Sequence, residues 1–161
     1  MGVRGLERTP LKVMDRAMKL GALGGYFLAE AVIPRMARRG RGTFIFTGAT
    51  AGLRGNSGHL AHAAGMFARR GMAQSLAHEF GPQGVHVCHV IAEGMVDAPD
   101  TLGKMMPEFF RKAREELLPI DGIIKPDAVA DAYYYLHTQP RHSWTAEMDL
   151  RPWRDKAWYQ D

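Results

Sequence analysis

One stretch of the chain decides the fold: Gly42-Thr43-Phe44-Ile45-Phe46-Thr47-Gly48-Ala49-Thr50-Ala51-Gly52. Its centre, residues 43–47, is β-branched and aromatic and is bounded by glycines, which predicts a short buried strand. The glycine-containing run that follows, residues 48–58, predicts a loop. Helical periodicity then appears on both sides of this strand and loop.

The two flanking segments are predicted to be helices. Residues 9–39 carry apolar side chains at helical spacing, with Thr9 expected as the N-cap and Pro10 at the first helical position. Pro34 lies inside this pattern and is expected to kink the helix or end its regular part. Residues 59–80 present an apolar or small-residue face at the same spacing and predict a second helix.

The remainder of the chain continues the alternation of strand and helix. Residues 85–91 predict a second strand, residues 93–137 a variable and helical segment, and residues 144–150 a third strand. Strands that alternate with helices indicate an α/β fold with a parallel sheet of about three strands. We therefore expect residues 1–161 to form one domain.

Composition excludes several kinds of site. Cys88 is the only cysteine, so neither an intrachain disulfide nor a cysteine-ligated zinc site can form. Four histidines, His59, His62, His86 and His89, have no Asp or Glu beside them at a ligand spacing, so no metal site is predicted.

Net charge is 21 − 17 = +4, and much of the excess falls in two arginine clusters. The clusters are Arg35, Arg38, Arg39 and Arg41, and then Arg69 and Arg70. No aromatic residues are interleaved with them, so we interpret them as solvated helix ends and expect no nucleic-acid binding.

Apolar runs are all shorter than the roughly 18 residues that a membrane-spanning helix needs. The first seven residues lack the apolar core of a signal peptide. These two observations predict a cytoplasmic protein with no membrane contact.

Three segments carry a resemblance to a known family. The stretch 42–52, the Gly-Gly-Tyr-Phe sequence at 24–27 and the Gly-Pro-Gln-Gly-Val-His-Val sequence at 81–87 resemble the C-terminal half of a short-chain dehydrogenase/reductase (SDR). Residues 136–141 and 149–153 resemble a bacterial subgroup of that family. The resemblance implies a partial Rossmann-type parallel sheet flanked by helices, NAD or NADP as cofactor, and oxidoreduction of a carbonyl or an alcohol.

Members of that family move a proton with an Asn, a Ser and a Tyr-x-x-x-Lys pair, in which the lysine lowers the pKa of the tyrosine. The resemblance places Gly21 at the Asn position, Ala49 at the Ser position, His62 at the Tyr position and Met66 at the Lys position. A one-residue shift would offer Thr50 in place of the serine. None of the four family residues is present, and His62 is the one candidate left for proton transfer.

The family's cofactor half is also missing from this sequence. Gly21–Gly25 lies inside a predicted helix, and residues 48–58 have the spacing of the substrate loop and not of a pyrophosphate-binding turn. The segment that contacts nicotinamide in the family matches at Gly94 alone, which makes Gly94 a weak cofactor-binding candidate. Glu93 and Asp97 add negative charge beside it, which disfavours a dinucleotide phosphate.

Two functions follow from these expectations. The first is an SDR-like protein that is catalytically inert as this chain and acts as a binding or oligomer-forming pseudoenzyme. Helices 9–39 and 59–80 would then pack against a second copy, helped by small residues: Gly21, Gly24, Gly25, Ala63, Ala64 and Gly71. The alternative is an NAD(P)-dependent oxidoreductase, active if the chain is part of a longer protein or if His62 replaces the usual tyrosine. In a third interpretation, the start is misassigned and upstream sequence encodes the missing half. No substrate follows from the sequence.

Overall fold

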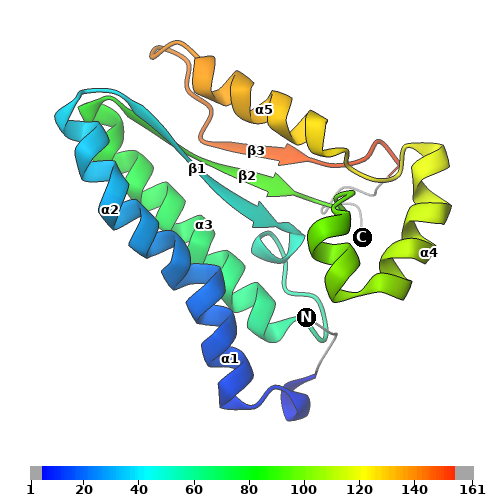
Figure 1. Ribbon diagram of the computed structural model, residues 1–161. Helices are drawn as coiled ribbons and strands as arrows, with labels where there is room; N and C mark the ends of the chain where they lie inside the picture. The colour runs from blue at the N-terminus through cyan, green and yellow to red at the C-terminus, as the bar shows by residue number, and fades with distance from the viewer. Residues whose placement is uncertain (1–4, 155–161) are drawn as a thin grey trace.

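A three-stranded parallel sheet forms the centre of the molecule (Figure 1). The computed structural model describes residues 5–154, so the first four residues, considered above for a signal peptide, lie outside it. The strands are β1 (Gly42–Ala49), β2 (Val85–Ala92) and β3 (Glu147–Leu150), in the order β1-β2-β3. Among the described residues β1 pairs on one side only, so it is an edge strand.

The observed strands differ in length from the strands predicted from the sequence. β1 continues past Thr47 because Gly48 and Ala49 pair in register with Ile91 and Ala92 of β2. β3 begins later than residue 144 because Trp144 stacks on the ring of His86, with centroids 4.9 Å apart, instead of joining the ladder.

The first long helix runs through residues 11–38 and contains one π turn. It comprises α1 (Leu11–Met18), the π turn η2 (Lys19–Leu23) and α2 (Gly24–Arg38). The expectation that Thr9 caps it is wrong: Pro10 is the N-cap, and the Thr9 hydroxyl donates to the carbonyl of Gly5 at 2.9 Å. Pro34 does not end the helix, because the preceding Ile33 is 1% exposed and anchors this turn in the core.

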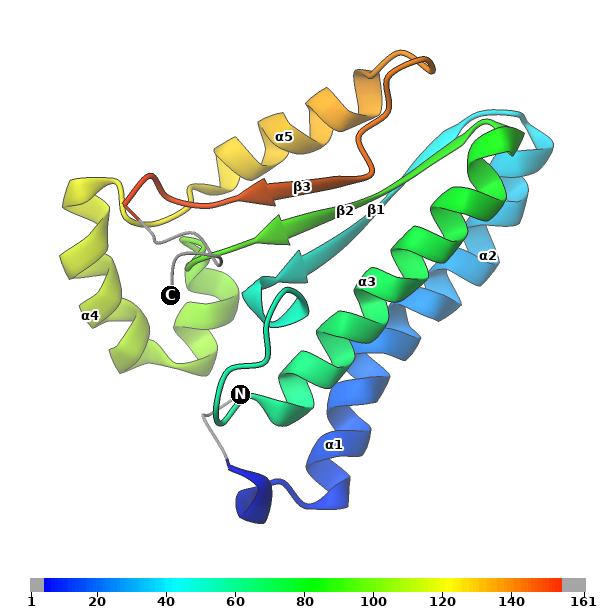
Figure 2. The same cartoon turned by 180° about the vertical axis from the view of Figure 1, so that it is seen from behind.

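Helices cover both faces of the sheet (Figure 2). α2 and α3 (Leu60–Phe80) pack on one face, and α5 (Pro126–Thr138) packs on the other. The core under α2 and α3 comprises Ala29, Ile33, Phe44, Phe46, Ala73, Val85 and Val87, and the core under α5 comprises Cys88, Val90 and Leu136. β2 is buried on both faces, which explains its almost continuous apolar sequence.

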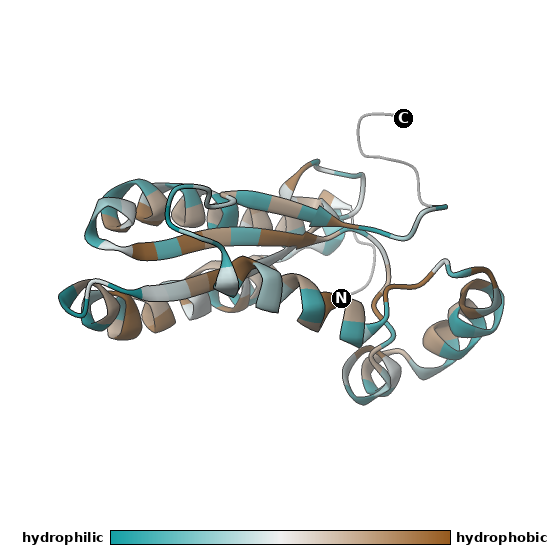
Figure 3. Cartoon of the chain, turned by 90° about the horizontal axis from the view of Figure 1, so that it is seen from above, coloured by the Kyte–Doolittle hydropathy of each residue, from teal (hydrophilic) through white to brown (hydrophobic). Residues whose placement is uncertain are grey.

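The variable segment leaves the sheet after β2 and forms a separate group of helices at the carboxyl end of the strands (Figures 1 and 3). It contains the π turn η5 (Pro99–Gly103), α4 (Pro107–Leu117) and the 3-10 turn Leu118–Ile120. An isolated parallel bridge between Val96 and Ile124 ties its two ends together. Three further 3-10 turns are Leu6–Arg8, Thr50–Gly52 and Gly81–Gln83. No helix within residues 5–154 is both long and apolar enough to cross a bilayer.

Candidate functional site

The positions that correspond to the family's proton relay gather where β1 ends and α3 begins. Ala49 packs against a small apolar cluster made of Ala51, Ala63 and Met66. The Met66 side chain is 7% exposed, so a thioether is buried where the family has an ammonium group. Thr50, the shifted candidate for the serine, opens the 3-10 turn after β1, where its carbonyl accepts the backbone N–H of Leu53.

Gly21 lies where the first helix crosses α3 at very short range. A Cβ on Gly21 would lie 2.9 Å from the Cα of Gly65, and a Cβ on Gly65 would lie 2.9 Å from the carbonyl oxygen of Ala17. Real side chains essentially never approach backbone so closely, so an asparagine does not fit at position 21 in this arrangement. The glycine at this position permits close packing between two helices of one chain.

His62 lies on the first turns of α3 and is partly buried. Burial lowers the pKa of the imidazole, and the neighbouring His59 and Arg69 lower it further. The ring is therefore neutral at neutral pH and can accept a proton, but it is a poor proton donor there. The family's tyrosine differs from it, because the tyrosine donates a proton when a carbonyl is reduced.

Arg69 binds the π turn of the first helix and does not extend into solvent as predicted. Its guanidinium donates to the carbonyls of Gly21 (2.7 Å), Leu20 (3.0 Å) and Thr47 (2.6 Å). Burial lowers the pKa of Arg69. One side chain of α3 thus fixes both the turn that carries Gly21 and the end of β1.

Arg70 contributes to a second polar network, on the face of the sheet that α3 covers. Its Nε and Nη2 donate to the Glu147 carboxylate on β3 at 2.8 and 2.6 Å, and the His89 Nδ1–H donates to the same carboxylate at 3.0 Å. Burial alone would raise the pKa of Glu147, but its bonds to Arg70 and His89 hold it below the ordinary value. Burial lowers the pKa of His89 despite the carboxylate, so we assign the neutral Nδ1–H form.

Sequence reasoning missed this network because its members are far apart in the chain. Gly48 is part of the same arrangement, since a Cβ there would overlap the Nε2 of His89. A signal was present: Glu147 and Asp149 alternate along a predicted strand, which places two acids on one face of the sheet. Of these two acids Glu147 is the one that meets a basic side chain of the covering helix, Arg70.

The carboxyl edge of the sheet holds the weak cofactor-binding candidate. Gly94 has φ +126°, a backbone conformation that favours glycine. Its neighbour Glu93 is 2% exposed, and the Asp97 carboxylate accepts from Arg114 Nε at 2.9 Å. Neither the Glu93 nor the Asp97 side chain supplies a cation or an N–H donor for a phosphate.

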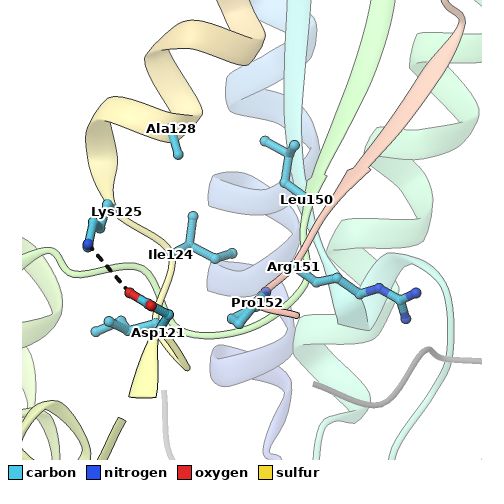
Figure 4. Close-up of a pocket in the computed structure, with 8 residues that line it drawn as sticks. Asp121, Ile124, Lys125, Ala128, Leu150, Arg151 and Pro152 are labelled. Atoms are coloured by element: carbon cyan, nitrogen blue, oxygen red, sulfur yellow. Dashed lines mark ion pairs between the residues drawn. The ribbon is translucent and has the colours of Figure 1, made fainter. Parts of the chain in front are cut away.

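A cavity of about 230 Å³ lies at the same edge, between the end of β3 and the start of α5 (Figure 4). Ile123, Ile124, Ala128, Leu150 and Pro152 give it mainly apolar walls, and Asp121, Lys125 and Arg151 complete the lining. Lys125 is paired with Asp121 at 3.6 Å, and the Arg151 side chain extends away from Ala128. The cavity can accommodate a small apolar group.

The four histidines noted above do not converge. His86 bonds to the carbonyls of Leu136 and Thr145, and His89 bonds to Glu147. Residues 86 and 89 are an odd number apart on one strand, so their side chains lie on opposite faces of the sheet. Among the residues that the structure describes, no group of three or more metal-ligating side chains forms.

Comparison with known proteins establishes the family. The family model described as enoyl-(acyl carrier protein) reductase matches residues 3–148. The chain belongs to the short-chain dehydrogenase/reductase family. The resemblance carried by residues 42–52 and 81–87 is confirmed, and so is the α/β fold with a parallel sheet flanked by helices.

Individual SDR relatives are longer than this chain. It is 33% identical over 81 residues to the 3-ketodihydrosphingosine reductase of Bos taurus, which covers 50% of this chain and 24% of that protein. It is 30% identical to a short-chain dehydrogenase from Rhodopseudomonas palustris, with a TM-score of 0.72, covering 95% of this chain and 58% of that one.

A serine dehydrogenase complexed with NADP+ shares the fold at 18% identity and a TM-score of 0.83, covering 98% of this chain and 63% of that one. The NADP+ belongs to that protein, and the likeness at this identity shows the shared fold. The chain spans less than two thirds of the length of each of these three proteins.

Proposed function

We propose that this SDR chain is catalytically inert through the family's proton relay and acts as a binding and self-associating member of the family. One observation carries the proposal: three of the four positions that correspond to the relay are closed by packing within the chain. Ala49 and Met66 belong to one apolar cluster, and Gly21 is closed against Gly65. No hydroxyl or ammonium group replaces the lost side chains within this cluster.

A second copy of the chain is the proposed partner. Large apolar side chains stay exposed on the helices that cover one face of the sheet, among them Leu20 (60%), Leu23 (42%) and Phe27 (59%) on the first helix, and Leu60 and Phe67 (44% each) on α3. Exposed apolar residues that gather on adjoining helices favour association, because burying them removes apolar surface from water.

Light scattering over a range of concentrations tests this association. We expect a dimer or larger assembly, and we expect Phe27→Glu to shift it toward the monomer. The matched control is Tyr134→Glu, which places the same charge at an aromatic position on α5, across the sheet, that is 70% exposed. A monomeric wild-type chain at high concentration contradicts the self-association.

An NAD(P)-dependent oxidoreductase is the second candidate, favoured by His62. A neutral, partly buried imidazole at the Tyr position can take the proton of an alcohol during its oxidation. In this alternative the chain is part of a longer protein that contributes to cofactor binding, or His62 takes the role of the usual tyrosine.

Titration calorimetry with NADH and NADPH separates the two functions. Micromolar binding to this chain overturns the inert assignment, and we expect none. If turnover of any alcohol is found, His62→Ala should abolish it, and unchanged turnover excludes His62 as the base.

A further inference from the structure

His86 is a buried histidine near the start of β2, on the face of the sheet that α5 covers. The residue is 2% exposed. A polar side chain buried to this degree needs hydrogen-bond partners, because it has lost its contact with water. Within residues 5–154 its partners are two backbone carbonyl groups, and no side-chain oxygen is bonded to it.

Both nitrogens of the His86 ring point at these carbonyls. Nδ1 lies 3.1 Å from the Leu136 oxygen near the end of α5, and Nε2 lies 2.9 Å from the Thr145 oxygen in the segment that leads into β3. A carbonyl oxygen only accepts hydrogen bonds, and a neutral imidazole has one N–H and one nitrogen with a lone pair. The neutral ring therefore makes one of the two bonds, whereas the imidazolium form, with two N–H groups, makes both.

Trp144 also favours the imidazolium form. Its ring stacks on the His86 ring, with centroids 4.9 Å apart and planes 5° apart. A cation over the face of an indole is attracted by its π electrons, and more strongly where water is excluded. Burying a charge is unfavourable by itself, but here two charge-assisted hydrogen bonds and an aromatic face take the place of the lost water.

Thr145 is held in place by Gln139. The Thr145 N–H donates to Gln139 Oε1 at 2.9 Å, and Gln139 Nε2 donates to the Thr145 hydroxyl at 2.7 Å. The Trp144 Nε1–H donates to the Gln139 carbonyl at 3.4 Å. These bonds fix the direction of the Thr145 carbonyl, so it stays aimed at His86 whichever form the ring takes.

No carboxylate among the described residues is bonded to His86. The titratable and charged side chains on this face belong to α5, to β2 and to the loop between α5 and β3: Asp127, Asp131, Tyr133, Tyr134, Tyr135 and His137, then Cys88, then Arg141 and His142. Both acids are exposed and lie more than one turn of α5 before Leu136. Arg141 donates to the Gly40 carbonyl, and its charge acts against a second cation nearby. The two carbonyls and the Trp144 face are thus the groups that hold a charge on His86.

We propose that His86 is a pH-sensitive clasp: when the ring gains its second proton, it bonds both carbonyls and fastens the end of α5 and the segment before β3 to β2. When the ring is neutral, one of the two bonds is lost and this end of the fold loosens. The stabilisation is therefore complete in acid and is lost as pH rises. The clasp lies at the opposite end of the sheet from Gly94, so it does not depend on the proposed function.

NMR of the chain labelled with 13C and 15N tests the clasp between about pH 5 and pH 8, the range in which histidines change charge. In acid we expect both ring nitrogens of His86 to carry hydrogen and to have nearly equal 15N shifts, whereas the two shifts of a neutral ring are far apart. The carbonyl carbons of Leu136 and Thr145 should shift with the ring, because one loses its donor and the other exchanges a charged donor for a neutral one.

A ring that stays neutral throughout this range overturns the proposal. A second proton that leaves either carbonyl unshifted overturns it as well, because the proton then does not complete both bonds. This measurement uses the wild-type chain, so it decides the proposal even if a substitution at His86 prevents folding.

Urea denaturation of His86→Gln gives an independent measurement, because glutamine is polar and does not titrate. We expect the difference in urea midpoint between the wild-type chain and His86→Gln to widen as pH falls. His78→Gln, at an exposed position on α3, is the matched control, and its difference from the wild-type chain should stay small at each pH. A His86→Gln difference that narrows as pH falls shows that the fold favours the neutral ring and overturns the proposal.

Discussion

Gly65 and Gly71 are two residues of the same helix with opposite environments. A Cβ at Gly65 would press on the Ala17 carbonyl, whereas nothing lies within 4 Å of a Cβ at Gly71. Both glycines lie in the predicted helix of residues 59–80, and the helical pattern alone does not distinguish them. Only the crossing with the first helix separates them, and its partners, Ala17 and Gly21, are more than 40 residues away along the chain.

We expect Gly65→Ala to lower the free energy of unfolding by about 1–3 kcal/mol, because overpacking against backbone outweighs the gain in helix propensity. Gly71→Ala should raise it by roughly 0.5–1 kcal/mol, because alanine is the better helix former and meets no obstacle. Urea denaturation of both variants measures the difference. Equal effects of the two substitutions would contradict the close crossing.

At the scale of elements, the π turn η2 depends on a side chain from another helix. The carbonyls of Leu20 and Gly21 are bonded by Arg69 of α3, whose third bond reaches Thr47 at the end of β1. The turn, α3 and the end of the strand should therefore open together.

Arg69→Met should destabilise the chain by about 1–2 kcal/mol, since three backbone carbonyls lose a charged donor, two of them at exposed positions. Hydrogen exchange at Gly24, whose N–H closes the turn onto Lys19, should speed up. Arg39→Met, at the exposed end of the first helix, is the control and should change stability by less than roughly 0.5 kcal/mol. An unchanged exchange rate at Gly24 would show that the turn holds without Arg69.

Patterns among neighbouring residues of the sequence predicted the helices and strands well and the polar contacts between them poorly. β1 was predictable because its glycines and β-branched residues are adjacent, but its last two residues join the strand only through pairing with β2. Arg69 and Arg70 were misinterpreted as solvated because charge composition does not say which face of a helix meets a strand end. The partner of Arg70 lies 77 residues away, on a strand that itself pairs with β2.

At the scale of the molecule, titratable groups with shifted pKa values change the free energy of unfolding in opposite directions as pH falls. Burial lowers the pKa of His62 and of His89, so both contribute stability above about 6.5 that is lost as pH falls through their folded pKa values. Glu93 has a raised pKa and contributes stability that is lost as pH rises. The two effects partly cancel in mildly acidic solution.

We therefore expect Glu93→Gln to steepen the loss of stability between pH 7 and pH 5, because it removes the opposing group. His62→Gln should make that loss shallower, by up to about 1.4 kcal/mol for each unit by which the histidine pKa is lowered. Urea midpoints at three pH values measure both slopes. A slope that Glu93→Gln leaves unchanged would contradict the assigned direction for Glu93.

The crossing of Gly21 and Gly65 also constrains any attempt to install the family's relay in this chain. The relay would require Gly21→Asn together with Ala49→Ser, His62→Tyr and Met66→Lys, and the first of these cannot be accommodated until two helix backbones move apart. An engineered relay therefore needs a redesigned helix crossing before it can receive its catalytic side chains.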